Sequence, residues 1–156
     1  MKTFLTAFVM LATTSAMAAT TGTLQLQGVV GVTNEIIINA KAEATALNII
    51  GGETNRNVAE VTEKSNSPTG YKINMKSANA GRLIHTTDNG KQTPYTVSYN
   101  GQSAISLHQT DQTVKTVSNL NNMTTQTSQV IVNVTPLSNA MAGTYQDTVT
   151  ISIVAN

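Results

Sequence analysis

Apolar and polar residues alternate along most of the chain, and this period of two is typical of half-buried β-strands. A clear example is residues 71–76, where Tyr71, Ile73 and Met75 share one face. The alternation predicts strands at residues 29–38, 46–50, 57–62, 71–76, 82–86, 95–99, 103–107, 113–118, 128–134 and 145–154. Helical periodicity is nearly absent, and the one helix candidate, residues 39–47, is short and rich in alanine.

Residues suited to tight turns separate these runs. The clearest hairpin signal is residues 95–107, where Asn100-Gly101 fits a type I′ turn between two alternating segments. Many short strands at regular spacing, with no helices between them, are typical of a sandwich or a barrel. The length of the chain and the number of runs favour an all-β fold, a single immunoglobulin-like β-sandwich.

The first residues have the pattern of a secretion signal. Lys2 precedes an apolar run at residues 4–12, and the small residues Ala16 and Ala18 mark a cleavage site before Ala19. The run is much shorter than the ~20 residues that a membrane-spanning helix needs. We therefore expect the protein to be exported, with cleavage after Ala18.

The charge of the chain is low and balanced. Charged residues make up 11% of the sequence, with nine basic and eight acidic side chains, and removal of Lys2 leaves eight of each. Such a balance argues against nucleic acid or an anionic membrane as a partner. A weakly charged surface rich in Thr, Asn, Ser and Gln suits a protein that packs against its own copies. Cysteine is absent, so stability must come from the core and from whatever the chain pairs with.

No pattern predicts a catalytic, metal or cofactor site. His85 and His108 lack a second histidine, a cysteine or a carboxylate at ligand spacing, and we interpret both as solvated strand or loop residues. Glu60 and Glu63 lie three apart in a polar stretch, and Asp147 is placed as a turn or strand-start residue. Nucleophile elbows, phosphate loops and calcium loops do not occur. The sequence therefore predicts a protein that is not an enzyme and holds no cofactor.

Both ends of the expected mature chain alternate. In the N-terminal segment, one side carries Leu24, Leu26, Gly28 and Val30. In the C-terminal segment, the apolar row consists of Val149, Ile151, Ile153 and Ala155. An uncovered edge strand with an apolar face is a template for pairing with another chain. The expected division is a signal peptide at residues 1–18, a donor-strand extension at 19–32 and a β-domain at 33–156.

These ends resemble those of pilin subunits of the bacterial chaperone–usher pathway, in particular the cysteine-free branch. Residues 24–30 have the form of the family's N-terminal extension, with a glycine on the apolar row. Gly143 is fourteenth from the end, as in the family's C-terminal signature. Residues 142–153, which include Tyr145, are close to the family's ending of a small residue followed by Gly-x-Tyr-x-Asp. Ala155 stands where the family often has tyrosine.

The resemblance implies an incomplete immunoglobulin-like sandwich that is completed by a donor strand from a neighbouring subunit. A periplasmic chaperone first lends a strand, and at an outer-membrane usher the extension of the next copy replaces it. The resemblance makes Leu24, Leu26, Gly28 and Val30 the donor residues, with Gly28 where the groove is shallow. The implied acceptor and chaperone-recognition residues are Gly143, Tyr145, Val149, Ile151, Ile153 and Ala155.

The function implied by the resemblance is that of a structural subunit of a surface pilus, or fimbria, which supports adhesion or biofilm formation. Its partners are then copies of itself in a head-to-tail fibre, the chaperone, the usher and a host or surface receptor. The alternative is a complete, monomeric secreted β-sandwich that binds a carbohydrate or a host protein. In that case residues 22–32 form the first strand of the protein's own sheet. A small secreted inhibitor, or an enzyme with an unrecognised site, is a third interpretation.

Overall fold

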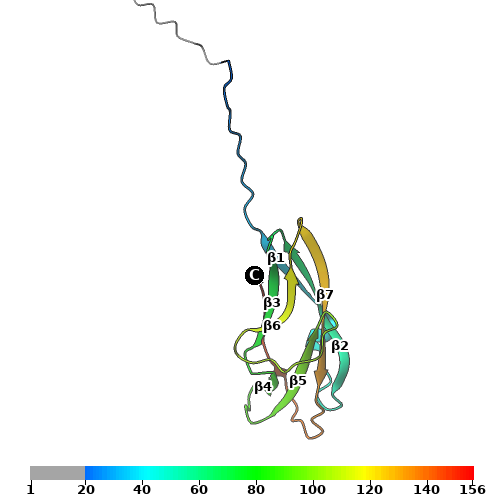
Figure 1. Ribbon diagram of the computed structural model, residues 1–156. Coiled ribbons are helices and arrows are strands. Elements are labelled where there is room, and N and C mark those ends of the chain that lie inside the picture. The colour runs from blue at the N-terminus through cyan, green and yellow to red at the C-terminus, as the bar shows by residue number, and fades with distance from the viewer. Residues whose placement is uncertain (1–19) are drawn as a thin grey trace, which may run out of the picture. The chain divides into compact units, whose positions relative to one another are not determined.

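The computed structural model describes residues 20–156, which form an all-β fold with one short 3₁₀ helix (Figure 1). The expected cleavage site at Ala16, Ala18 and Ala19 lies outside the described residues. The elements are β1 (Asn34–Ala40), η1 (Ala42–Thr45), β2 (Glu53–Ser65), β3 (Gly70–Ser77), β4 (Arg82–His85), β5 (Gln92–Tyr99), β6 (Gln112–Ser118), β7 (Thr124–Val134), β8 (Tyr145–Gln146) and β9 (Val149–Ala155).

The strands form two antiparallel sheets, an arrangement consistent with a β-sandwich. The larger sheet has the order β1-β2-β7-β5-β4-β8, and the smaller sheet has the order β6-β3-β9. Alternate residues of the central strands are buried, as in β3, where Tyr71, Ile73 and Met75 are almost wholly inaccessible to solvent. Residues 31–156 make up one compact unit. The all-β class expected from the alternation is therefore confirmed.

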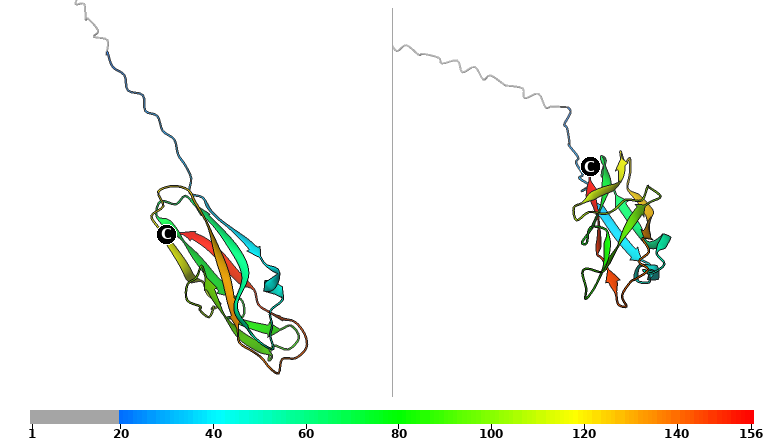
Figure 2. Two further views of the ribbon diagram at one scale, coloured as in Figure 1. Left: turned by 90° about the vertical axis from the view of Figure 1, so that its right-hand side faces the viewer. Right: turned by 90° about the horizontal axis from the view of Figure 1, so that it is seen from below.

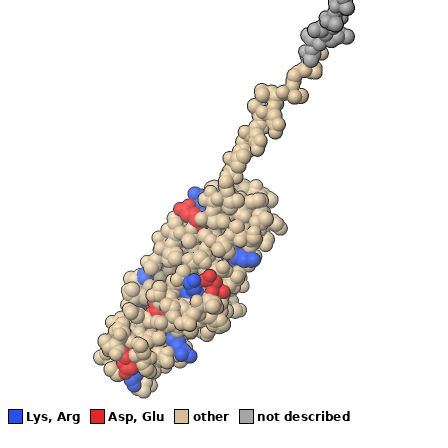
Figure 3. Space-filling model, turned by 90° about the vertical axis from the view of Figure 1, so that its left-hand side faces the viewer, with Lys and Arg blue, Asp and Glu red and all other residues tan. Residues whose placement is uncertain are grey.

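Charged side chains are sparse and scattered on the face that Figure 3 presents. In the described part of the chain, three ion pairs join exposed or half-exposed groups: Lys41 with Glu60, Lys64 with Glu35, and Lys76 with Asp111. Exposed pairs of this kind contribute little to stability. Within residues 20–156 there is no helix with the length and hydrophobicity needed to cross a membrane.

The type I′ hairpin turn predicted at Asn100-Gly101 is present. Both residues have positive φ, +50° and +74°, and the Gln102 amide donates to the Tyr99 carbonyl across the turn. The prediction of a strand at residues 103–107 is wrong, because only Ile105 forms a bridge, with Val97. One bridge is enough to close the hairpin but does not make a ladder.

Several other strand predictions need correction. Residues 46–48 are irregular and residues 49–51 form a turn, in which the Asn48 side chain accepts a hydrogen bond from the Gly51 amide; Gly52, which follows, has φ +74°. The predicted strand at 29–38 begins only at Asn34. The predicted strand at 145–154 is interrupted after Gln146 and resumes at Val149 as β9. The helix candidate at 39–47 is reduced to the four-residue η1.

A buried ionic cluster joins the two sheets, and the sequence did not reveal it. Glu63 on β2 is completely inaccessible to solvent, in contrast to its expected place in a polar stretch. Its carboxylate accepts hydrogen bonds from Tyr71, Tyr99, Ser128 and Lys115, at 2.6–2.8 Å. Tyr71 and Lys115 belong to the smaller sheet, whereas Glu63, Tyr99 and Ser128 belong to the larger one.

The protonation of this cluster follows from its hydrogen bonds. Burial by itself raises the pKa of Glu63, but the donors Lys115, Ser128, Tyr99 and Tyr71 together hold that pKa below its usual value. Burial, followed by the hydrogen bond to the Glu63 carboxylate, raises the pKa of both tyrosines. Glu63 is therefore an ionised group at neutral pH, paired with the Lys115 ammonium at 2.8 Å.

Candidate functional site

The two sheets leave two edges open on the same side of the fold. Among residues 20–156, β1 pairs only with β2, and β9 pairs only with β3. β1 and β9 nevertheless lie near each other, one on each sheet (Figure 2). Each therefore presents a row of unpaired backbone groups, and unpaired edges of this kind can accept another strand. We call the space between β1 and β9 the groove.

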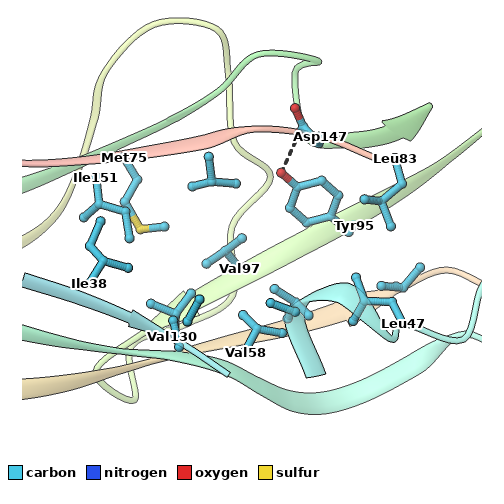
Figure 4. A pocket seen from close by; sticks show the side chains of 16 residues that line it. Ile38, Leu47, Val58, Met75, Leu83, Tyr95, Val97, Val130, Asp147 and Ile151 are labelled. Carbon is cyan, nitrogen blue, oxygen red and sulfur yellow. Dashed lines mark hydrogen bonds between the residues drawn. The ribbon is translucent and has the colours of Figure 1, made fainter. Parts of the chain in front are cut away.

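The groove contains an apolar cavity that reaches the core. The cavity has a volume of about 240 Å³, and its lining includes Ile38 of β1, Val149 and Ile151 of β9, and Met75 and Val130 from the sheets behind them (Figure 4). Protein interiors are usually close-packed, with few voids larger than a water molecule. Ile38 lines the cavity and is still 46% exposed. An apolar segment that fills the groove would cover side chains that are now partly in contact with water.

A cluster of polar side chains lies at one end of the groove, where β9 begins. The Asp147 carboxylate accepts hydrogen bonds from the Tyr95 hydroxyl at 2.6 Å, the Asn79 amide at 3.0 Å and the Thr148 amide at 2.7 Å (Figure 4). Ser77 donates to the same carboxylate. Burial, followed by the hydrogen bond to Asp147, raises the pKa of Tyr95, so its hydroxyl keeps its proton. Asp147 therefore separates β8 from β9 and fixes the start of β9 against β3 and β5.

The residues predicted to line the acceptor occupy different positions. Val149 and Ile151 line the cavity, and Ile153 is half-buried against the core. Ala155 continues the row but is exposed at the end of β9, outside the cavity lining. Thus the part of the row nearest Asp147 faces the cavity.

Gly143 and Tyr145 precede β9 and pack around His85. The prediction that His85 is solvated is wrong, because it is 3% exposed, whereas His108 is exposed. The His85 ring lies edge-on to Tyr145, with ring centroids 5.0 Å apart. Its Nδ1 accepts from the Thr87 amide at 3.3 Å, and its Nε2 lies 3.2 Å from the Ala142 carbonyl. With a proton on Nε2, that nitrogen donates to the Ala142 carbonyl while Nδ1 accepts from Thr87.

Position 143 requires glycine because of its backbone conformation and because the His85 ring lies close to it. Its φ is +146°, and an added Cβ would overlap Nε2 of His85 and lie 2.9 Å from Cε1 of the same ring. The position predicted from its distance to the end of the chain therefore has a packing role beside the groove.

Replacement of this glycine is expected to destabilise the folded unit by displacing His85. Gly143→Ala should lower the free energy of unfolding, measured in urea, by about 1–3 kcal/mol more than Gly101→Ala does, because of overpacking. Gly101 is the matched control, since it also has positive φ (+74°) but has no atom within 4 Å of an added Cβ. Equal losses in the two variants would show that His85 does not constrain position 143.

The residues predicted to act as a donor strand are exposed. Leu24, Leu26 and Val30 are 83%, 84% and 87% exposed. An added Cβ at Gly28 would meet nothing within 4 Å. Residues 20–33 have no strand assignment. The extension therefore offers its alternating apolar row to solvent.

Sequence reasoning missed the β1 side of the groove. Ile38 was predicted to lie in a strand, but not to line the groove, and the cavity residues Met75 and Val130 lie far from either terminus. Among residues 20–156, no three His, Cys, Asp or Glu side chains are grouped to hold a metal ion.

A comparison with protein-family models gave no match, and a comparison with curated proteins gave none either.

Proposed function

We propose that this protein is a structural subunit of a surface pilus and polymerises by donor-strand exchange. In this proposal, residues 33–156 form an incomplete immunoglobulin-like sandwich, and residues 24–30 of a neighbouring copy complete it. The observation that carries the proposal is the groove, an apolar cavity of about 240 Å³ between β1 and β9, two edge strands that each have one open edge among the described residues. The same chain has an exposed extension with the alternating pattern that such a groove accepts.

The dimensions of donor and acceptor agree. β9 has seven residues, and the donor row from Leu24 to Val30 spans the same length. Burial of Leu24, Leu26 and Val30 would contribute roughly 4–9 kcal/mol before ordering costs, at about 1.5–3 kcal/mol for each side chain. That sum is comparable to the whole stability of an ordinary domain, roughly 5–15 kcal/mol. The paired backbone would add hydrogen bonds along β9 and fix the register.

Strand donation between different surfaces of identical copies does not close, so it produces a fibre. Before assembly, the apolar groove would be exposed to water. In this proposal a periplasmic chaperone covers it by lending a strand, and the exchange for the strand of the next copy takes place at an outer-membrane usher. A cell-surface fibre built in this way would serve adhesion or biofilm formation. If the protein were instead a monomeric binding module, residues 22–32 would form a strand of its own sheet. Residues 20–33 have no strand assignment.

Gly28 provides the test of this function. Gly28→Leu is expected to abolish or greatly slow polymerisation, because the resemblance places this residue where the groove is shallow and a residue without a Cβ is needed. The readout is the ladder of polymers on an SDS gel of unboiled protein collected from the surface of producing cells. Gln27→Leu is the matched control, since it adds leucine at the adjacent position on the opposite row.

The expected result is a ladder for the wild type and for Gln27→Leu, and monomer for Gly28→Leu. Circular dichroism of the monomer should be unchanged, because a Cβ added at Gly28 meets no atom within 4 Å in the single chain. A normal ladder from Gly28→Leu would refute the assignment of the donor row. A wild type that runs only as monomer would refute the pilus function itself.

A further inference from the structure

The exposed large apolar side chains of residues 31–156 lie in three parts of the fold. Ile37, Ile38 and Val154 lie on the edge strands β1 and β9. The other four lie at two ends of the fold and have no role in the groove: Val32, Ile50, Met123 and Met141. Scattered single apolar residues are ordinary, but Ile50 and Met141 line one cavity and so form a local apolar surface.

Val32 and Met123 belong to the end at which the extension joins the folded unit. Val32 lies between Gly31 and Thr33, and Met123 precedes Thr124, which pairs with Ser65 at the end of β2. We call this end, made of residues 31–33, the turn 66–69 and the loop 119–123, the root pole. The connection between β6 and β7 marks it in Figure 1.

Ile50 and Met141 belong to the opposite end. They line a shared cavity of about 380 Å³ formed by the loops 47–52 and 136–144. The Leu137 amide donates to the Ile49 carbonyl at 2.9 Å and joins the two loops. We call this end the far pole. Its second loop, 136–144, leads directly into β8, so the far pole lies next to the start of the groove.

The root of the extension is fixed in place by Asn66. The Thr33 amide donates to Asn66 Oδ1 at 2.6 Å, and Asn66 Nδ2 donates to the Gly31 carbonyl at 2.9 Å. The Asn66 amide also donates to the Thr33 carbonyl at 3.2 Å. Residues 31–33 are therefore attached to the turn that follows β2 and do not act as a loose linker.

The shortness of this link brings two copies together. A donor strand that ends at Val30 is joined to β1 at Asn34, and four residue steps span at most about 14 Å. Antiparallel pairing with β9, the more stable type of pairing, would place Val30 beside Val149, at the far pole of the acceptor. The root pole of the donor copy must then lie against the far pole of the acceptor copy.

We infer that consecutive copies form a second contact, in which Val32 and Met123 of one copy pack on Ile50 and Met141 of the next. This inference rests on the proposed function. The far pole is covered by a second copy of this chain. Once that copy has donated its strand, the short link holds its root pole against the far pole of the acceptor copy. Together with the Asn66 attachment, the contact makes each junction a fixed joint rather than a hinge.

Cysteine cross-linking tests this contact directly, because the chain has no cysteine of its own. The double variant Met123→Cys/Met141→Cys should form a disulfide at each junction, provided that the two Cα atoms lie within about 7 Å. After oxidation, the expected result is a ladder that survives boiling in SDS and collapses to monomer with reductant. Val32→Cys/Ile50→Cys is an independent second pair with the same expectation.

The matched control is Gln129→Cys/Met141→Cys, since Gln129 is exposed in the middle of β7 and belongs to neither pole. It should give a ladder only before boiling, and each single variant should give at most a dimer after boiling. If both test pairs give a ladder only before boiling, the contact between the root pole and the far pole is refuted, and donor-strand exchange stands. If no ladder forms before boiling, the proposed function fails and the inference fails with it.

Discussion

Residues 21–32, appended to the C-terminus of residues 33–156 through a short flexible linker, are expected to raise the melting temperature by about 10–30 °C relative to residues 33–156 alone. The gain comes from Leu24, Leu26 and Val30, whose burial in the groove contributes roughly 4–9 kcal/mol. The appended segment can reach the groove because β9 ends at Ala155, and a strand that turns back from there runs antiparallel to β9.

A control separates filling of the groove from a nonspecific effect of the added chain. The same appended segment with Leu24→Ser and Leu26→Ser should lose most of the gain, because the backbone can still pair but the cavity stays unfilled. Thermal unfolding followed by circular dichroism measures all three proteins. If the appended strand gives no gain, and residues 20–32 at their natural position give a stable monomer, the domain completes itself and the fibre is excluded.

Glu63→Ala is expected to lower the free energy of unfolding by about 3–5 kcal/mol, because it leaves the Lys115 ammonium buried and without its counter-ion. The lysine side chain is 11% exposed, so water cannot replace the carboxylate fully. The double variant Glu63→Leu/Lys115→Met should recover most of this loss, since it removes both charges together. Urea unfolding at pH 7 measures each variant.

Glu60→Ala is the matched control for this prediction. Glu60 lies on the same strand and pairs with Lys41 at 2.9 Å, but its side chain is 44% exposed. Its loss should therefore change the stability by no more than about 1 kcal/mol. Equal effects at positions 60 and 63 would show that the buried cluster does not stabilise the fold.

The same cluster predicts the direction of acid sensitivity. Because the pKa of Glu63 is lowered in the folded state, its contribution is fully present above the pKa of an unfolded glutamate, about 4.3. The contribution is lost as the pH falls through the lower folded-state value. Stability should thus decline on acidification below pH ~4 in the wild type, and less steeply in Glu63→Leu/Lys115→Met.

Local patterns in the sequence were enough to predict the central strands and the turn at Asn100-Gly101. Those features depend on neighbours within a few residues, such as the alternation in β3 and the two positive φ values of the turn. The same alternation failed at residues 46–50, because Ile49 and Ile50 follow each other in a turn that Asn48 and Gly52 stabilise. A run of apolar residues cannot by itself distinguish such a turn from a short strand.

The groove was only partly predictable, because one wall comes from each end of the domain. The apolar row of β9 could be read directly from the sequence, and Val149 and Ile151 of that row line the cavity. The burial of Glu63 and His85 could not be read, since their partners come from distant strands and loops. Lys115 is 52 residues from Glu63, and Ala142 is 57 residues from His85.

The pairing of β9 with β3 also governs when the chain can fold. Tyr71 pairs with Ala155, so the smaller sheet, in which β3 also pairs with β6, is not complete until β9 has been added. Pairing between segments so distant in sequence is slow, typically in milliseconds to seconds. Throughout that interval β3 is without the strand that covers one of its edges. A variant that stops before Val149 would leave that edge of β3 open, and an open edge of this kind invites pairing with other chains.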